Sequence, residues 1–323
     1  MVFFFLAGFT FAQDPDDDIT VDSSVVRLNV GVVNSTGRPI TNLSRSNFKI
    51  FEDGIAQDIS HFEPTSAPFS VVLILDMSGS TLGFRQNIKF SASRFIDALS
   101  PDDRVSVLEF YNRVNVLNGF TTDRSKIYHS IKVSNGKKGE TKTQLFRAID
   151  LALDKLATEG SRRKAIIVLT DGADTAARDM DRNQLNKLED SEMTGAVNPE
   201  ENPLLKSALD KASKYSVTIY PLALPTNDPR KFIDPLPIQL AMYDLARERL
   251  NILATRTGGE MHKINRLEEM GVLYARVAAN VRSLYTIEYQ PKNVKKDGKW
   301  REIKLKLNMP DLVYTTRPGY FAQ

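Results

Sequence analysis

Apolar and polar positions alternate at both ends of the chain. Every second residue from Val26 to Val32 is apolar, which is the period of a half-buried strand. A similar pattern at 48–50 is followed by a Glu-Asp-Gly turn signal, and alternation returns at 303–307. One more strand is expected within 313–321. Both ends of the chain are therefore predicted to be β-structure.

The middle of the chain has a different pattern. Continuous apolar runs such as 71–75 and 165–169 are typical of strands covered on both faces of a parallel sheet. Between these runs, apolar residues recur at helical spacing. The predicted strands are 71–75, 105–110, 114–117, 165–169 and 217–222, and the predicted helices are 88–99, 145–156 and 267–281. This alternation predicts an α/β domain with a doubly wound, mostly parallel sheet flanked by helices, like a Rossmann fold.

The length of the chain suggests how these parts combine. At roughly 150 residues per domain, 323 residues correspond to about two domains. Neither β-rich end is long enough to bury a stable core alone. We therefore expect the N-terminal segment 19–66 and the C-terminal segment 283–323 to pair into one small β-sandwich. The α/β domain, 67–282, would be inserted into it.

The first residues have their own pattern. Residues 2–12 are almost all apolar and are followed by the acidic stretch 14–18. The run is shorter than the ~20 residues needed to span a bilayer. It resembles a secretory signal cleaved after Ala12, although the usual positive charge before it is missing; a buried terminal strand is the alternative. We therefore assign 1–18 to a signal-peptide-like segment with an acidic start, and expect an exported protein, periplasmic, secreted or on the cell surface, with no span in the mature chain.

Composition narrows the chemistry. The chain has no cysteine and three histidines, and 43 basic residues against 40 acidic ones give a net charge of +3. This excludes disulfides, thiolate metal sites and a cysteine nucleophile, and it disfavours a histidine-based site. The small positive surplus also argues against a surface built for nucleic acid. Any metal is therefore expected to be a hard cation bound by oxygen.

Oxygen-bearing side chains gather where a parallel sheet binds ligands. Asp76, Ser78 and Ser80 follow the run 71–75, Thr143 precedes a predicted helix, and Asp171 follows 165–169. Ligands of open α/β sheets bind beyond the carboxyl ends of strands. Two carboxylates balance a doubly charged ion, and Mg²⁺ prefers such oxygen ligands. Taken singly, each motif would also fit a turn or a helix cap.

The order of these motifs resembles a known family. The patterns DxSxS at 76–80, TxLxxAI at 143–149 and TDG at 170–172 are similar to the metal-ion-dependent adhesion site of von Willebrand factor type A domains, over about 67–282. The resemblance implies that Ser78 and Ser80 hold the metal directly, Thr143 directly or through water, and Asp76 and Asp171 mostly through water. Mg²⁺ is expected, with Mn²⁺ or Ca²⁺ as alternatives. The positions expected to meet a partner are Met77, Gly79, Thr141 and Gly172. The whole chain further resembles bacterial exported proteins termed VWFA-related, through segments 47–54, 285–289 and 317–320.

Three functions follow from these observations. The first is a non-enzymatic adhesion or scaffold module, in which a divalent cation bridges to an aspartate or glutamate of a protein partner. The second is a Mg²⁺-dependent hydrolase or phosphotransferase, such as one of haloacid dehalogenase type. Such enzymes usually carry a second carboxylate two residues after the first, where this chain has Ser78, so we expect no enzyme. The third is a structural subunit of an envelope complex with a vestigial site.

One segment departs from the expected pattern. Residues 178–201 carry seven acids and three bases, a net charge of −4, in an unusually long connection after Asp171. We expect this insertion to extend over the metal site. It is predicted to be a solvated acidic loop or, alternatively, to supply an acid that caps the metal or to select partners.

Overall fold

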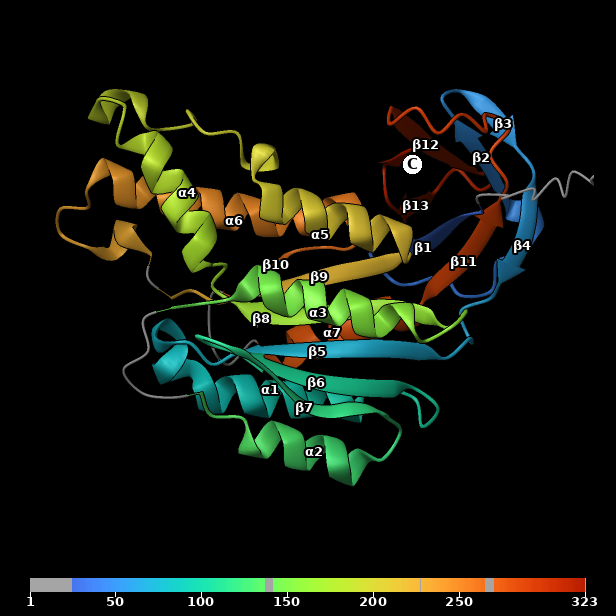
Figure 1. Ribbon diagram of the computed structural model, residues 1–323. Helices are drawn as coiled ribbons and strands as arrows, with labels where there is room; N and C mark the ends of the chain where they lie inside the picture. Colours follow the sequence, from blue (N-terminus) through green and yellow to red (C-terminus); the bar gives the residue numbers. More distant parts are fainter. Residues whose placement is uncertain (1–24, 137–141, 227, 265–269, 323) are drawn as a thin grey trace, which may run out of the picture.

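The computed structural model describes residues 25–136, 142–226, 228–264 and 270–322, arranged as an α/β domain beside a β-sandwich (Figure 1). The predicted signal segment 1–18 and Thr141 lie outside the described residues. No helix within these ranges is both long and apolar enough to cross a membrane.

The α/β domain is built on a six-stranded sheet in the order β10-β9-β8-β5-β6-β7. All neighbouring pairs are parallel except β6 with β7, which is antiparallel. The strands are β5 (Phe69–Asp76), β6 (Arg104–Phe110), β7 (Val114–Thr121), β8 (Arg163–Thr170), β9 (Val217–Ala223) and β10 (His262–Lys263). The predicted fold class, a doubly wound α/β sheet, is confirmed.

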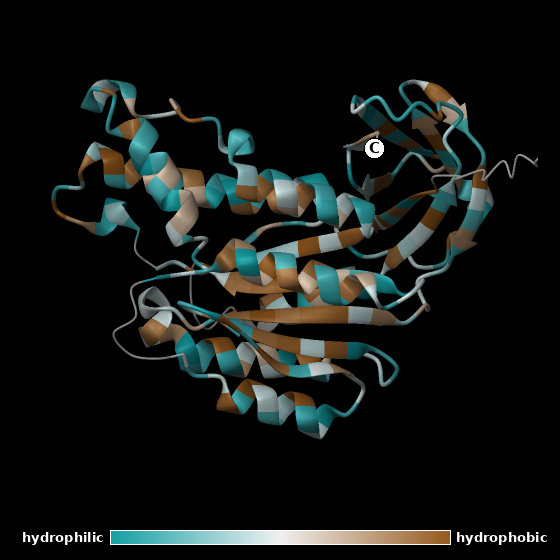
Figure 2. Cartoon of the chain, in the orientation of Figure 1, coloured by the Kyte–Doolittle hydropathy of each residue, from teal (hydrophilic) through white to brown (hydrophobic). Residues whose placement is uncertain are grey.

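Helices cover both faces of this sheet, and the residues of the central strand alternate between them. Phe69, Val71 and Leu73 of β5 pack in one core, while Val72 and Ile74 pack in the other. Both faces are therefore apolar, as the brown strands of Figure 2 show. The first core contains α1 (Arg85–Asp97), α2 (Arg124–Val133) and α7 (Met270–Arg282), and the second contains α3 (Leu145–Ala157), α4 (Thr175–Leu185), α5 (Pro203–Lys214) and α6 (Pro237–Thr257).

The longest helix, α6, is not predicted from the sequence pattern, and neither are α2, α4 and α5. Two sides of α6 are buried against different partners. Leu250 and Leu253 pack toward the sheet, whereas Ala241 and Leu245 pack in a separate apolar cluster with residues of the 178–201 insertion. A helix buried on two sides lacks the single apolar stripe by which amphipathic helices are recognised.

Strands from both ends of the chain form the β-sandwich. In the sheet β13-β1-β11-β4, Leu28 pairs with Ile287, and in the sheet β14-β12-β2-β3, Ile50 pairs with Leu305. Side chains of both sheets share one core. The strands are β1 (Val26–Asn34), β2 (Phe48–Glu52), β3 (Ile55–Gln57), β4 (Ile59–Glu63), β11 (Leu284–Tyr289), β12 (Trp300–Leu307), β13 (Leu312–Thr315) and β14 (Gly319–Phe321).

The expectation of a single strand within 313–321 is wrong. β13 pairs with β1 in one sheet, and β14 pairs with β12 in the other. Residues 316–318 carry the chain between the sheets. Pro318 has no N–H to donate to a ladder, although its carbonyl accepts a hydrogen bond from the Ile303 amide, so the strand divides here.

One buried arginine joins the two connections between sandwich and α/β domain. The guanidinium of Arg163, at the start of β8, donates to the carbonyls of Thr65 and Ala67 in the incoming connection. It also donates to the carbonyl of Leu284 at the outgoing one, and it stacks over the Phe69 ring at 4.2 Å. Both crossings of the chain are therefore fixed to one point at the amino end of the sheet.

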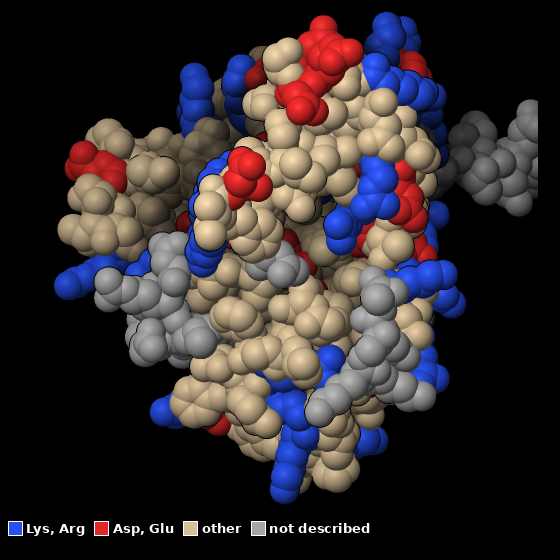
Figure 3. All heavy atoms as spheres, turned by 90° about the vertical axis from the view of Figure 1, so that its left-hand side faces the viewer, with Lys and Arg blue, Asp and Glu red and all other residues tan. Residues whose placement is uncertain are grey.

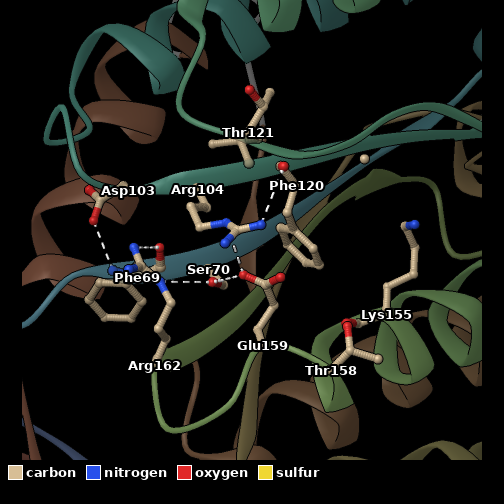
Figure 4. Close-up of polar contacts among 12 residues, drawn as sticks. Phe69, Ser70, Asp103, Arg104, Phe120, Thr121, Lys155, Thr158, Glu159 and Arg162 are labelled. Carbon is tan, nitrogen blue, oxygen red and sulfur yellow. Dashed lines mark hydrogen bonds and ion pairs between the residues drawn. The ribbon is translucent and has the colours of Figure 1, made fainter.

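The rest of this amino edge is a network of hydrogen bonds with one ion pair (Figure 4). Glu159 accepts from the Ser70 hydroxyl at 2.6 Å and forms an ion pair with Arg104 at 3.2 Å. Arg162 Nε donates to the same hydroxyl at 3.1 Å. Asp103 accepts from the Phe69 amide at 2.9 Å. The carboxylate of Glu159 thus has a guanidinium partner, and that of Asp103 has an amide donor.

Candidate metal centre

At the opposite, carboxyl edge of the sheet, β5 ends in the buried carboxylate of Asp76. The Ser78 amide donates to its Oδ1 at 3.0 Å, and the Thr170 hydroxyl, at the end of β8, donates to its Oδ2 at 2.7 Å. The Thr81 hydroxyl donates to the Asp76 carbonyl at 2.8 Å. The carboxylate is held by groups from two adjacent strands, so its position is set by the sheet itself.

The two serines of the DxSxS pattern lie side by side in the turn that follows. Their hydroxyl oxygens are 3.0 Å apart, with Ser78 buried and Ser80 partly exposed. Adjacent ligands of an octahedral Mg²⁺, each about 2.0–2.1 Å from the ion, lie about 2.9 Å apart. Arg85 donates to the carbonyl of Met77 at 2.5 Å and to that of Ser78 at 3.3 Å, which fixes the turn. The spacing of the hydroxyls therefore suits a small hard cation.

The second carboxylate, Asp171, follows β8 and is also buried. It accepts from the Thr226 hydroxyl at 2.8 Å and from the Ala173 amide at 3.0 Å. Gly172 between them has a φ of +87°, and a Cβ there would lie 2.9 Å from a carbon of Leu250. Only glycine fits this turn without strain.

Negative charge at this edge has no positive partner. Burial, and then the nearby Asp171, raise the pKa of Asp76 to about 7, against the hydrogen bonds from Ser78 and Thr170. Within the described ranges, neither Asp76 nor Asp171 forms an ion pair with a lysine, arginine or histidine. Buried carboxylates are normally paired or bound to a metal. The donor set, two carboxylates and two hydroxyls without a cation, is therefore chemically suited to a divalent metal ion.

Thr143 lies two residues before helix α3 and contacts the start of helix α4. Its amide donates to the Thr175 hydroxyl at 2.8 Å, and its carbonyl accepts from the Thr175 amide at 3.0 Å. The buried carboxylate of Asp174 accepts from the amides of Phe146 and Ala177, both at 3.1 Å. Asp174 thus fixes the first turns of α3 and α4 together, and with them the distance between Thr143 and the Asp171 turn.

The structure brings four of the five predicted ligands into contact or electrostatic interaction: Asp76, Ser78, Ser80 and Asp171. Among the described residues, no hydrogen bond links the Thr143 side chain to them. Nor does this part of the chain hold a group of three or more histidine, aspartate or glutamate side chains suited to a metal. A cation here would therefore depend on hydroxyl ligands as well as the two carboxylates.

Part of the chain matches a known protein family. Residues 71–173 match the family model of the von Willebrand factor type A (VWA) domain. The match runs from β5 to the turn after β8. It covers about a third of the chain and includes all five predicted ligands.

Solved structures show weaker similarity. The vWF domain of the type V pili tip protein Mfa5 from Porphyromonas gingivalis is 14% identical, covers 66% of this chain and 94% of that chain, and has a TM-score of 0.47. A von Willebrand factor type A protein from Catenulispora acidiphila is 13% identical, with 94% and 64% covered and a TM-score of 0.48. An aerotolerance-related membrane protein from Bacteroides fragilis is 15% identical, with 66% and 98% covered and a TM-score of 0.44. The search of curated proteins gives no match.

Three residues that support the centre were not predicted from the sequence. Thr170 is the first residue of the TDG pattern, but its contact with Asp76 was not predicted, and the position of Asp174 before a helix is a recognisable N-cap signal. Thr226 comes from the connection between β9 and α6, 55 residues after Asp171. No local pattern links it to the centre.

Two expected partner contacts of the VWA region are corrected. Met77 is fully buried in the core beneath the turn, and Gly172 is buried against α6, so neither can face a partner. Gly79 is exposed at the centre, as expected. Thr141 lies outside the described residues.

The expectation of a solvated acidic loop over 178–201 holds in part, because six of its seven acids are exposed, but much of the segment is helical and Asp181 is not solvated. The segment contains most of α4 and the short 3₁₀ helices η3 (Asp190–Glu192) and η4 (Pro199–Glu201). Asp181 is buried and forms a two-bond ion pair with buried Arg249 of α6, the longer bond being 2.7 Å. The insertion is anchored to helix α6 of the α/β domain by this pair and by the apolar cluster against α6.

Figure 3 looks onto the end of the molecule at which these strands finish. The face is hollowed near its centre, and lysine and arginine atoms are spread around the hollow. The carboxyl edge is therefore a recessed surface with both basic and acidic groups toward its rim.

Proposed function

We propose that the protein is a metal-dependent protein-binding module, acting in adhesion or as a scaffold and not as an enzyme. A divalent cation, Mg²⁺ in the first instance, would be held by Asp76, Ser78, Ser80, Thr143 and Asp171. When bound, it would supply an electrophilic position for a carboxylate oxygen of a protein partner.

The observation that carries the proposal is the uncompensated charge at the carboxyl edge. Burial, and then the nearby Asp171 carboxylate, raise the pKa of Asp76 to about 7, and neither carboxylate is paired with a basic residue of the described chain. The family match over 71–173 supports the same assignment. An exported location stays a prediction from the N-terminal apolar run.

Each residue has a separate task in this proposal. The Asp76 carboxylate, held by Thr170, orients the Ser78 amide and brings negative charge. Ser78 and Ser80 offer neutral oxygens 3.0 Å apart, which do not add charge. The two carboxylates neutralise the charge of a divalent ion without exceeding it. The ion can therefore still bind a further carboxylate from another molecule.

Isothermal titration calorimetry of Mg²⁺ and Mn²⁺ tests the metal centre. We expect saturable binding by the wild type and none by Asp76→Ala. The exposed Asp97→Ala variant on α1 is the matched control and should bind as the wild type does. Metal binding unchanged in Asp76→Ala would contradict the assignment.

Capture of proteins from the native envelope fraction then tests the bridging role. Partners should be retained with Mg²⁺ and lost with chelator or in Asp76→Ala. A partner retained equally with chelator would refute a metal bridge. Hydrolysis of phosphoesters by the metal-loaded wild type, abolished in Asp76→Ala, would instead favour the enzyme.

A further inference from the structure

A cavity of about 1060 Å³ lies between the insertion and helix α6, near the carboxyl edge of the sheet. We call it the docking cavity. Its walls come from the insertion, from the connection after β9, from α6 and from the region of β10. Apolar side chains form much of its lining, namely Met193, Val197, Ala223, Pro225, Leu245 and Ile264.

The docking cavity and the candidate metal centre share a bordering segment of the chain. Pro225 lines the cavity, and the next residue, Thr226, donates its hydroxyl to Asp171 at 2.8 Å. Ala223, which ends β9, also lines it. One short segment therefore borders both, and a molecule bound at the centre could extend into the cavity.

Positive charge at the cavity lacks acidic partners. Arg230 is the exception, since it pairs with Asp244 at 2.6 Å and with Asp228 at 3.6 Å. Arg247, by contrast, donates to the Tyr243 hydroxyl and the Leu224 carbonyl. In the described chain, the ammonium groups of Lys231 and Lys263 form no ion pair, and both side chains are exposed.

The acids at the cavity do not fully cancel this charge. Asp228 and Asp244 both pair with Arg230, and Glu248 accepts from Asn251 and forms no ion pair with a basic residue of the described chain. Four basic residues against three acidic ones leave the lining with a net charge of +1. The charge of the cavity therefore complements an acidic ligand.

Exposed apolar residues follow directly on this basic segment. Phe232 and Leu236 are 52% and 58% exposed, and Ile233 is completely exposed. Exposed apolar side chains grouped beside a cavity are typical of interaction surfaces. In combination with the basic rim, they favour a ligand with both acidic and apolar side chains.

We propose that the docking cavity binds an extended segment of a protein partner, rich in acidic and apolar side chains. This inference rests on the proposed function, because the same partner would place a carboxylate at the metal centre. The volume slightly exceeds the usual range for small-molecule pockets, about 300–1,000 Å³, and accommodates several side chains of a peptide. The insertion would then select partners by forming one wall, and would not cap the metal.

The test uses a phage-displayed library of random 16-residue peptides with one fixed central aspartate, selected on the full chain in Mg²⁺. Enriched peptides are synthesised, and their affinities are measured by fluorescence polarisation. Two variants alter the cavity: the double charge reversal Lys231→Glu/Lys263→Glu, and Thr194→Trp, which places a large ring at an exposed lining position. Lys49→Glu/Lys187→Glu, at exposed positions that do not line the cavity, is the matched control.

We expect enriched peptides to carry acidic and apolar residues on one side of the aspartate. Their affinity should fall about tenfold or more in both cavity variants and stay within about twofold in the control, with the charge-dependent part weakening as salt rises. Calorimetric Mg²⁺ affinity should be the same in all these proteins.

Failure of this inference and failure of the proposed function are distinguishable. Peptides that need Mg²⁺ but bind both cavity variants normally would overturn the docking cavity and leave the metal bridge intact. Peptides that ignore chelator yet lose affinity in the cavity variants would support the cavity and contradict the bridge. Enrichment of no peptide overturns the cavity, while the Mg²⁺ titration alone then decides on the centre.

Discussion

The two edges of the six-stranded sheet differ in the partners of their carboxylates: the amino edge holds an ion pair, although its buried Asp103 has only amide donors. At the amino edge, Glu159 is paired with Arg104 at 3.2 Å, and arginines 162 and 163 bind the surrounding hydroxyl and carbonyl oxygens (Figure 4). At the carboxyl edge, Asp76 and Asp171 have hydroxyl and amide donors and no basic partner in the described chain.

This difference separates a structural network from a binding site. Burying an unpaired carboxylate costs free energy, so such charge persists where something outside the chain compensates it. The amino edge is complete by itself and holds the strands and connections in place. At the carboxyl edge, Asp76 and Asp171 lack a positively charged partner in the described chain, and this is the physical reason to place a cation there.

The largest predicted effect comes from removing the central carboxylate. Mutation of a residue that supports a metal ligand costs about 10–100-fold in metal affinity. Asp76 is itself a predicted ligand, so Asp76→Ala should lower Mg²⁺ affinity by more than ~100-fold. Calorimetry measures this loss. Without metal, the variant should be no less stable to urea than the wild type, because a buried repulsion is removed. A marked loss of metal-free stability would mean that Asp76 is a structural residue like Glu159.

The same repulsion predicts a pH dependence in the metal-free protein. Because folding raises the pKa of Asp76 from 3.8 to about 7, the folded state favours the protonated group. Its stabilising contribution is complete below about pH 4 and is lost as the pH rises toward 7. Asp76→Asn cannot titrate there. The unfolding free energy of the variant minus that of the wild type, from urea titrations in chelator, should therefore increase from pH 4 to 7, and a constant difference would contradict the coupling.

A smaller effect is expected from the support of the second carboxylate. Thr226→Val keeps the shape of the side chain but removes the donor to Asp171. Outer contacts of this kind are worth about 10–100-fold in metal affinity. Thr255→Val, at an exposed position in the last turns of α6, is the control. Equal Mg²⁺ affinity in Thr226→Val and the wild type would show that the Thr226 contact does not support the centre.

The smallest effect on metal binding belongs to the amino edge. Glu159→Ala leaves Arg104 without its carboxylate and Ser70 without its acceptor, and should lower the free energy of unfolding by about 1–3 kcal/mol. Mg²⁺ affinity should stay within about twofold, since the residue lies at the opposite end of the strands. Chemical denaturation and calorimetry on one preparation give both values. A strong loss of metal affinity would show that the edges are coupled.

Much of the centre is readable in the sequence because its parts are local. The apolar runs 71–75 and 165–169 identify two buried strands, and the residues directly after them must lie at the carboxyl edge. Asp76, Ser78 and Asp171 follow from this rule alone. The pairing of the two chain ends is similarly implied by segments too short to fold alone.

The features that were missed depend on distant partners. Thr226 reaches Asp171 from another connection, and Asp181 becomes a buried ion only because Arg249 lies opposite it on α6. From the sequence alone, a charged residue in an acidic stretch is predicted to be exposed to solvent, because its buried partner is not known. Met77 reads as part of a surface turn, although the turn directs its side chain into the core.

The connections held by Arg163 also have a mechanical consequence. The chain passes between sandwich and α/β domain twice, and both passages meet at the amino end of the sheet, opposite the carboxyl edge. A load applied to a partner at that edge would run lengthwise along β5 and reach the sandwich through two covalent strands in parallel. The tension on each would be about half of what a tandem arrangement with one linker must carry.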